Sequence, residues 1–287
     1  MACPIADIFR EAADLNVADP RRNGNTVRIE PGCEVIATGD LHGHRANLMK
    51  IVSYTDLGAR EDRRLVLQEI VHAPPDPRTG HDRSVDVLLR AARLKISHPK
   101  QVLFILGNHD VAQATGNEIT KAGRGVCEDF AAGVLYACGE DDAPEVLEAI
   151  TTFLLSTPIA VRCPGGVWIS HTLPTPQRME HAGRDVPEAP YGSADLRRGG
   201  RVYEWTWGRR QTPEQVDDLA QHLGACFFVL GHRHIDSAYE FIGPKAVILT
   251  AEHDRGCLLE FCSDQPLSEA DARDRLKPIA SLSRGGG

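Results

Sequence analysis

The apolar run Val35-Ile36-Ala37 leads into the turn Gly39-Asp40-Leu41-His42-Gly43-His44. The run predicts a buried strand, because short apolar stretches bounded by turn residues are typical of such strands. The glycines allow the backbone to turn tightly after it. Asp40 and His42 would then emerge together at a strand end, and one oxygen and one nitrogen ligand suit a metal ion. Taken alone, the motif is equally consistent with a turn that carries a solvated histidine.

The same arrangement recurs at other predicted strand ends. The apolar run over 101–106 ends in Gly107-Asn108-His109-Asp110, and the run that begins at Cys226 ends in Gly231-His232-Arg233-His234. A predicted hairpin over 158–170 adds His171. Ligands of α/β sheets gather beyond strand ends, so these groups can converge. One such histidine is more often a core residue, but four clusters together predict a shared metal site.

Composition narrows the classes of protein that fit this chain. Its 287 residues are 42% hydrophobic and 25% charged, which is enough for a large globular core. The net charge is −8 without a dense basic patch, so no nucleic-acid partner is expected. Apolar runs are too short for a membrane span, so no membrane partner is expected either. The first residues do not resemble a secretory signal, and the eight cysteines form no C-x-x-C pair. We therefore expect a cytoplasmic enzyme with reduced thiols.

Alternation of strands and helices begins at Glu34 and predicts an α/β fold. Helices are expected over 45–55, over 84–94 with Ser84 as the N-cap, and over 211–223 with Thr212 as the N-cap. A strand is expected over 64–71. We expect residues 1–33 to be an N-terminal extension, 34–265 one domain, and 266–287 a C-terminal tail with a disordered end.

The order Gly-Asp-x-His-Gly, Gly-Asn-His-Asp, isolated histidine, Gly-His-x-His resembles the calcineurin-like metallophosphoesterases. It is most similar to their serine/threonine phosphoprotein phosphatase branch, from about Glu34 to Phe261. The resemblance implies a four-layer α/β/β/α sandwich of two mixed sheets flanked by helices. It also implies two divalent metal ions, for which the ligand types favour Mn²⁺, with Fe or Zn²⁺ as alternatives. By the same resemblance one ion is held by Asp40, His42 and His234, the other by Asn108, His171 and His232, and His109 is the catalytic histidine.

The second motif of that family, Gly-Asp-x-x-Asp-Arg, is altered in this chain. Gln68 stands in place of the glycine and Glu69 in place of the aspartate that bridges both metals. We expect Glu69 to bridge the ions; the alternative is a solvent-facing Glu69 and a mononuclear or distorted site. His72 replaces the second aspartate, which orients the catalytic histidine, and a histidine cannot do this as a carboxylate does. His72 could instead be an extra ligand or contact the phosphate.

Other residues could supply the groups that the altered motif lacks. Asp82 or Asp110 could provide a carboxylate beside His109. The phosphate-binding arginine of the motif is replaced by Ala73. The candidates for its role, each also explicable as surface charge, are Arg45, Arg83, Arg209 and Arg210.

These residues predict a metal-dependent phosphoester hydrolase, most similar to phosphomonoesterases and protein phosphatases. Hydroxide activated by the metals would attack a phosphoprotein or a small phosphoester. Asn108 and His109 would stabilise the phosphoryl oxygens, and His109 would protonate the leaving group. One alternative is a phosphodiesterase or a dinucleotide polyphosphate hydrolase. A second, from another class, is a catalytically impaired metal-binding scaffold that binds a partner. The sequence predicts no oligomeric state.

Overall fold

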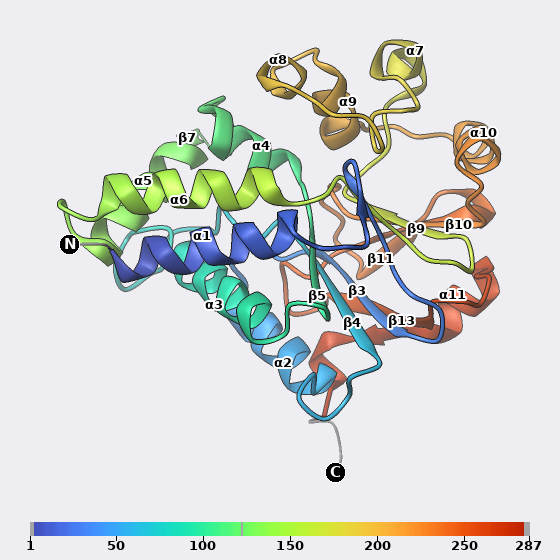
Figure 1. Ribbon diagram of the computed structural model, residues 1–287, viewed down its shortest axis with the longest axis horizontal. Helices are drawn as coiled ribbons and strands as arrows, with labels where there is room; N and C mark the ends of the chain where they lie inside the picture. Colours follow the sequence, from blue (N-terminus) through green and yellow to red (C-terminus); the bar gives the residue numbers. More distant parts are fainter. Residues whose placement is uncertain (1–2, 122, 284–287) are drawn as a thin grey trace.

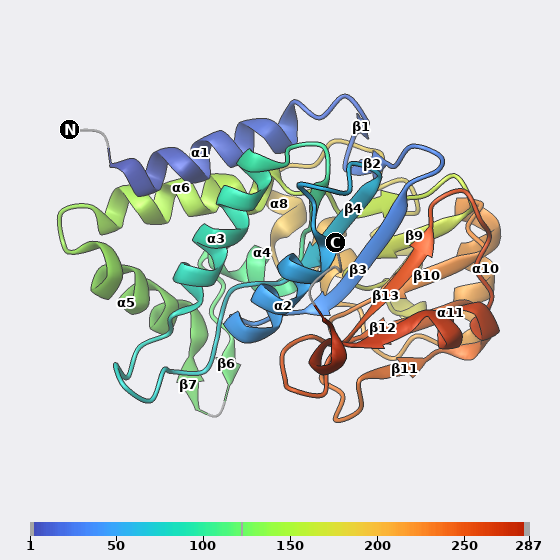
Figure 2. The same ribbon diagram turned by 90° about the horizontal axis from the view of Figure 1, so that it is seen from below.

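The computed structural model describes residues 3–121 and 123–283 (Figure 1). Two β-sheets lie face to face, and helices cover the outer face of each sheet (Figures 1 and 2). The inner faces meet in one apolar layer that contains Ile105 and Val66 from one sheet and Ile169 and Phe227 from the other. The expected four-layer α/β/β/α sandwich is therefore confirmed.

The first sheet has seven strands in the order β1-β2-β8-β9-β10-β12-β11. In that order they are β1 (Arg22–Asn23), β2 (Thr26–Arg28), β8 (Ala160–Arg162), β9 (Val167–Ser170), β10 (Phe227–Leu230), β12 (Ala246–Leu249) and β11 (Tyr239–Phe241). Strands β9, β10 and β12 are parallel to one another, so their carboxyl ends share one edge. The antiparallel pair β8–β9 is the hairpin expected over 158–170.

The second sheet has five strands in the order β14-β13-β3-β4-β5. They are β14 (Leu276–Pro278), β13 (Cys257–Cys262), β3 (Glu34–Asp40), β4 (Arg63–Gln68) and β5 (Val102–Ile105). Strands β3, β4 and β5 are parallel. A separate short hairpin is formed by β6 (Thr120–Lys121) and β7 (Arg124–Gly125). Because β3 to β5 are parallel, their carboxyl ends also share one edge of the sandwich.

Helices on the five-stranded sheet bury Phe9, Leu88 and Phe153 against Ile36 and Phe104. These helices are α1 (Pro4–Val17), α2 (Arg45–Thr55), α3 (Ser84–Ser97), α5 (Val126–Cys138) and α6 (Ala143–Ser156). The expected helix over 45–55 is thus confirmed. The helix expected over 84–94 is present but runs to Ser97, and Ser84 is its first residue rather than its N-cap.

The outer face of the seven-stranded sheet packs Trp168 and Phe228 against Trp205 and Leu219. The helices on this side are η1 (Pro176–Arg178), α7 (Met179–Ala182), α8 (Ser193–Leu196), α9 (Arg201–Trp207), α10 (Pro213–Leu223) and η2 (Gly243–Lys245). The Thr212 side chain accepts a hydrogen bond from the Gln215 amide, as expected of the N-cap of α10. The remaining helices are α4 (Asn108–Thr115), α11 (Glu269–Arg275) and η3 (Ile279–Ser281).

The segments expected as extension and tail both contact the sandwich. Helix α1 packs along α6 and α3, and β2 adds to the seven-stranded sheet beside β8 (Figure 2). Strand β14 pairs with β13 at the edge of the five-stranded sheet. The boundaries at residues 34 and 265 stay predictions. Disorder is expected over 281–287, but residues 281–283 are described and Ser281 is the last residue of η3. Residues 284–287 lie outside the described residues.

Candidate metal centre

Five predicted site residues lie at the edge where the parallel strands of both sheets end. Asp40 is the last residue of β3, Glu69 follows β4, Asn108 follows β5, His171 follows β9, and His232 lies two residues beyond β10. All five are at least nine-tenths buried. Residues far apart in the sequence therefore converge because the strands that carry them are parallel and packed face to face.

Two glycines leave the room that the carboxylates occupy. A Cβ atom at Gly107 would lie only 2.5 Å from Oε1 of Glu69, and one at Gly231 would overlap Oδ1 of Asp40. Real Cβ atoms essentially never approach a neighbour this closely. Gly107 and Gly231, which begin the Gly-Asn-His-Asp and Gly-His-x-His motifs, are thus required by packing at this edge.

Four of the site residues have left-handed backbone conformations. The φ angles are 39° at His42, 39° at Glu69, 66° at His72 and 72° at His232. Non-glycine residues rarely adopt these angles, and each costs about 1–3 kcal/mol. Strain of this kind clusters at functional sites, because the surrounding contacts hold the residue there for its side chain. The left-handed conformation of Glu69 also explains why β4 ends at Gln68. The prediction that this strand runs to residue 71 was therefore wrong.

The first group of ligand-type atoms comes from Asp40, Glu69 and His171, and these atoms lie within 4.8 Å of one another. Nδ1 of His171 is 3.4 Å from Oδ1 of Asp40, and Nε2 is 3.5 Å from Oε1 of Glu69. Oδ1 of Asp40 and Nδ1 of His171 are buried, and neither atom has a hydrogen-bond partner among the residues that the structure describes. Buried polar atoms normally have partners, so this pair has the donor chemistry of an ion site.

The second group comes from His42, Glu69 and His109, again with ligand-type atoms within 4.8 Å. Nε2 of His42 is 3.4 Å from Oε2 of Glu69, while Nδ1 of His42 lies 2.9 Å from the Val71 carbonyl oxygen. If Nδ1 donates to that carbonyl, Nε2 keeps its lone pair, as a metal-binding imidazole requires. Glu69 thus belongs to both groups, with one oxygen turned to each.

The pKa values of the buried carboxylates and of His171 also favour a bound cation at the cluster. Burial raises the pKa of Glu69 to about 8, so its carboxylate is costly to ionise without a positive neighbour. Burial opposes the ionisation of Asp40, but His171 holds the pKa of Asp40 below its usual range. Burial likewise opposes the charge of His171, yet the carboxylates of Glu69 and Asp40 raise its pKa to about 9. The donor set of carboxylates and imidazoles therefore fits divalent metal ions such as Mn²⁺, Fe or Zn²⁺.

Asn108 and His232 join the first group. Oδ1 of Asn108 lies 2.7 Å from Nδ1 of His232 and 2.9 Å from Nε2 of His171. The backbone amide of His232 donates to Oδ2 of Asp40 at 2.7 Å. Burial, with repulsion from His171 and Arg209, lowers the pKa of His232 well below its usual value. His232 is therefore neutral at pH 7, which is the form that binds metals.

His72 contacts the predicted catalytic histidine. Its Nδ1 lies 2.8 Å from Nδ1 of His109, and its Nε2 lies 2.9 Å from Oε1 of Gln113. The backbone amide of His72 donates to Oγ of Ser84, the first residue of α3, at 3.0 Å. His72 thus orients His109 by a ring-to-ring hydrogen bond, for which one of the two Nδ1 atoms carries the proton.

Asp82 and Asp110, the two carboxylates that could have lain beside His109, both accept hydrogen bonds from nearby backbone amides. Oδ2 of Asp110 accepts the Gly107 amide at 2.8 Å at the start of α4, and burial raises the pKa of Asp110 to about 7. Oδ1 of Asp82 accepts the Ser84 amide at 2.7 Å, and burial raises the pKa of Asp82 to about 6. Asp82 therefore fixes the backbone of Ser84, whose hydroxyl accepts the His72 amide.

The four candidate arginines differ in the residues that they contact. Nε of Arg209 donates to Nε2 of His232 at 3.2 Å. Arg83 pairs with Asp86 and lies over the Tyr136 ring. Arg45, Arg209 and Arg210 are all exposed, so the contact with His232 is what distinguishes Arg209. Arg209 is therefore the arginine that the structure places at the cluster.

His234 lies outside both ligand groups. Its side chain is 72% exposed, and its Nδ1 lies 2.8 Å from Oε1 of Glu252. Glu252 was missed by the sequence analysis, although Oε2 of Glu252 is 3.9 Å from Nε2 of His42. The signal was available, because the apolar strand over 246–249 ends in polar residues just as the other site strands do. Gln113 was also missed, and nothing in its helical context distinguishes it.

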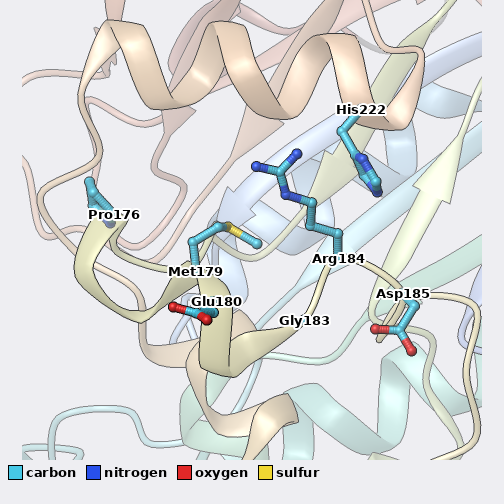
Figure 3. A pocket seen from close by; sticks show the side chains of 7 residues that line it. All are labelled: Pro176, Met179, Glu180, Gly183, Arg184, Asp185 and His222. Carbon is cyan, nitrogen blue, oxygen red and sulfur yellow. The ribbon is translucent and has the colours of Figure 1, made fainter.

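A surface pocket of about 660 Å³ lies away from the cluster. It is formed between the α7 region and α10, where Arg184 and His222 project into it above Met179 (Figure 3). Arg184 pairs with Asp218, and none of the predicted site residues lines this pocket. The buried cluster, not this pocket, therefore carries the candidate chemistry. Within the described residues, no helix is long and apolar enough to cross a membrane.

The fold and the cluster can be compared with known proteins. No family model and no curated protein matches the sequence. Among solved structures, one similar to this chain is a protein serine/threonine phosphatase from Saccharomyces cerevisiae, described as having similarity to human phosphatase PP5. The match has a TM-score of 0.68 and 14% identity and covers 96% of this chain and 92% of that one. Another is the cold-active protein-tyrosine phosphatase of a psychrophilic Shewanella species, with a TM-score of 0.55, 15% identity, and coverage of 88% and 80%. At these identities the likeness establishes a shared α/β sandwich fold.

Proposed function

We propose that this protein is a metal-dependent phosphoester hydrolase with a dinuclear site. The observation that carries the proposal is the position of Glu69, whose two carboxylate oxygens each face a different group of buried ligand atoms. A carboxylate shared in this way is the expected bridge between two ions. The phosphatases with the same fold support the choice of phosphoesters as substrates.

Two divalent ions at these groups would activate a water molecule and neutralise charge on the phosphoryl oxygens. Asp40, His171, Asn108 and His232 are proposed to hold one ion and His42 the other, with Glu69 between them. This differs from the sequence prediction, which grouped Asp40 with His42. Arg209 is proposed to bind a phosphoryl oxygen, because it is the arginine at the cluster.

His109 is proposed to donate a proton to the leaving oxygen. It begins α4 beside the cluster, and its backbone amide is fixed on Oε1 of Glu69 at 2.7 Å. The ring of His72, itself held by Gln113, contacts the ring of His109 in the place where the resembled motif has a carboxylate. A positioned histidine contributes about 100- to 10,000-fold to a step of this kind.

A phosphomonoester is the proposed substrate class, as a phosphoprotein or a small phosphoester. The test is hydrolysis of an aryl monophosphate and its diester by the purified protein with Mn²⁺. We expect the monoester to be the faster substrate. A faster diester would favour a phosphodiesterase or a dinucleotide polyphosphate hydrolase, and no turnover with Mn²⁺, Fe or Zn²⁺ would favour the scaffold.

His109→Ala tests the proposed acid. We expect turnover to fall at least about 100-fold while bound metal stays near the wild-type amount. His222→Ala is the matched control, since His222 is exposed on α10 and remote from the cluster. Full activity of His109→Ala would contradict the role, and so would loss of both metals.

A further inference from the structure

Gln113 and the proposed catalytic histidine lie one turn apart on the same helix, with a third side chain between them. Helix α4 carries His109 at its second residue and Gln113 four residues later, so both side chains lie on one face. The ring of His72 reaches this face from the segment that follows β4. Its Nδ1 lies 2.8 Å from Nδ1 of His109, and its Nε2 lies 2.9 Å from Oε1 of Gln113. Both nitrogens of His72 are therefore engaged by residues of α4.

The ring of His72 is also held in place by its other neighbours. The residue is buried, and its backbone amide donates to Oγ of Ser84 at 3.0 Å. Phe130 of α5 meets the His72 ring edge-on, with the ring centroids 5.7 Å apart. The ring therefore stays between His109 and Gln113 and does not turn to solvent.

The partner of Nε2 decides which nitrogen of His72 carries the proton. The amide oxygen of Gln113 only accepts hydrogen bonds, so Nε2 of His72 must donate to it. A neutral imidazole carries one proton, and Nδ1 of His72 is then an acceptor. The hydrogen bond between the two histidines therefore runs from Nδ1 of His109 to Nδ1 of His72. Nε2 of His109, on the opposite side of its ring, is then the nitrogen that exchanges a proton with a substrate.

The two histidines alone would not fix this direction. A carboxylate only accepts hydrogen bonds, whereas an imidazole can exchange the donor and acceptor roles of its two nitrogens. We propose that Gln113 is a positioning residue, which holds His72 in the tautomer protonated on Nε2 and thereby orients His109 for proton transfer. This inference rests on the proposed function for the role of His109, whereas the tautomer of His72 can be measured without any activity.

The first test locates the proton of His72 in wild type, Gln113→Leu and Gln113→Glu. Leucine accepts no hydrogen bond, whereas glutamate keeps an accepting oxygen at the same place. The proton is located by nitrogen NMR of histidine-labelled protein in the presence of diamagnetic Zn²⁺, and the His72 signals are those absent from His72→Asn. We expect a protonated Nε2 in wild type and Gln113→Glu, and a mixture of the two tautomers in Gln113→Leu.

The second test is hydrolysis of an aryl monophosphate by the same proteins. We expect kcat of Gln113→Leu to fall about tenfold, which corresponds to roughly one hydrogen bond, while KM changes by less than about twofold. Gln113→Glu should keep kcat within about threefold of wild type. Gln221→Leu is the matched control, because Gln221 is exposed on α10, and it should change neither constant. Circular dichroism and melting curves of all these variants should match those of wild type.

Three results would overturn the inference alone. They are a proton on Nδ1 of His72 in wild type, an unchanged tautomer in Gln113→Leu, and a rise in KM of that variant without a fall in kcat. If Gln113→Leu does not fold, loss of kcat in Gln113→Glu would overturn it, because that variant keeps the acceptor. If wild type hydrolyses no aryl phosphate, the proposed function fails and the catalytic role of Gln113 fails with it, while the NMR result still decides the direction of the hydrogen bond.

Discussion

Gly107→Ala tests the position of Glu69 without touching any ligand. Gly107 has φ −100° and ψ 171°, an extended conformation that alanine adopts without strain. The added methyl carbon would lie 2.5 Å from Oε1 of Glu69 and 3.2 Å from Oδ2 of Asp110. An ordinary contact begins at 3.4 Å, so the Glu69 oxygen must move by most of an ångström.

That movement has two consequences of calculable size. It breaks the charge-assisted hydrogen bond from the His109 amide to Glu69, now 2.7 Å, worth about 1.5–3 kcal/mol. Overpacking of the site adds about 1–3 kcal/mol. A misplacement of about 1 Å at a catalytic centre costs on the order of 100-fold in rate. We therefore expect a loss of about 3–5 kcal/mol in stability, a loss of bound metal, and at least a 100-fold loss of turnover.

The assays are urea unfolding, bound Mn²⁺ by elemental analysis, and aryl phosphate hydrolysis. Gly58→Ala is the control, because a Cβ there meets nothing within 4 Å and its φ is not left-handed. It should behave as wild type in all three assays. If Gly107→Ala keeps both its metals and its turnover, Glu69 does not occupy the place between the two ligand groups, and the argument for a bridge fails.

Three further results are expected. Removal of metal with a chelator should lower the melting temperature by roughly 5–10 °C, because each ion at 100 times its Kd stabilises the fold by about 2.7 kcal/mol; an unchanged melting curve would contradict a bound cation. Asp82→Asn should remove a pH-dependent loss of stability. The pKa of Asp82 is raised to about 6 in the fold, so the folded protein holds a proton that the unfolded chain releases. Wild-type stability therefore falls relative to the variant between about pH 4 and 6, by on the order of 2–3 kcal/mol, and parallel pH profiles in urea unfolding would refute this. Arg209→Ala should raise KM for an aryl phosphate about tenfold without loss of metal, whereas exposed Arg210→Ala should not; equal KM values would show that Arg209 binds no phosphate.

The sequence alone predicted the sandwich architecture and the edge of the sheets at which the site lies. Short apolar runs that end in polar residues predicted strands β3, β5 and β10, because buried parallel strands have this pattern. Since the packing of parallel strands brings their ends together, Asp40, Asn108 and His232 could be assigned to one site from the sequence alone. Local chemistry was equally direct at Thr212, whose hydroxyl caps α10.

Prediction of secondary structure from the sequence failed at residues whose conformation is set by contacts with distant segments of the site. The run over 64–71 has the composition of a strand, but the chain leaves the sheet after Gln68 because Glu69 is left-handed. Serine is a residue typical of N-caps, but Ser84 is the first residue of α3, and its hydroxyl accepts a hydrogen bond from the His72 amide. In both cases a contact between distant segments outweighs a local propensity, and such contacts are not encoded in a window of neighbouring residues.

The geometry of the segment from Gln68 to His72 can be understood from these contacts together. A glutamate is one methylene longer than aspartate and would carry its carboxylate outward from a straight strand. Here the backbone of Glu69 turns at φ 39°, and its carbonyl accepts the amides of Leu41 and His42 at 3.1 and 2.9 Å. The carboxylate then returns toward the space that Gly107 leaves open, where the His109 amide binds it. The longer side chain is thus compensated by a strained turn that is fixed at both ends. The same turn places Nδ1 of His72 2.8 Å from Nδ1 of His109, so one backbone turn couples the positions of Glu69 and His72.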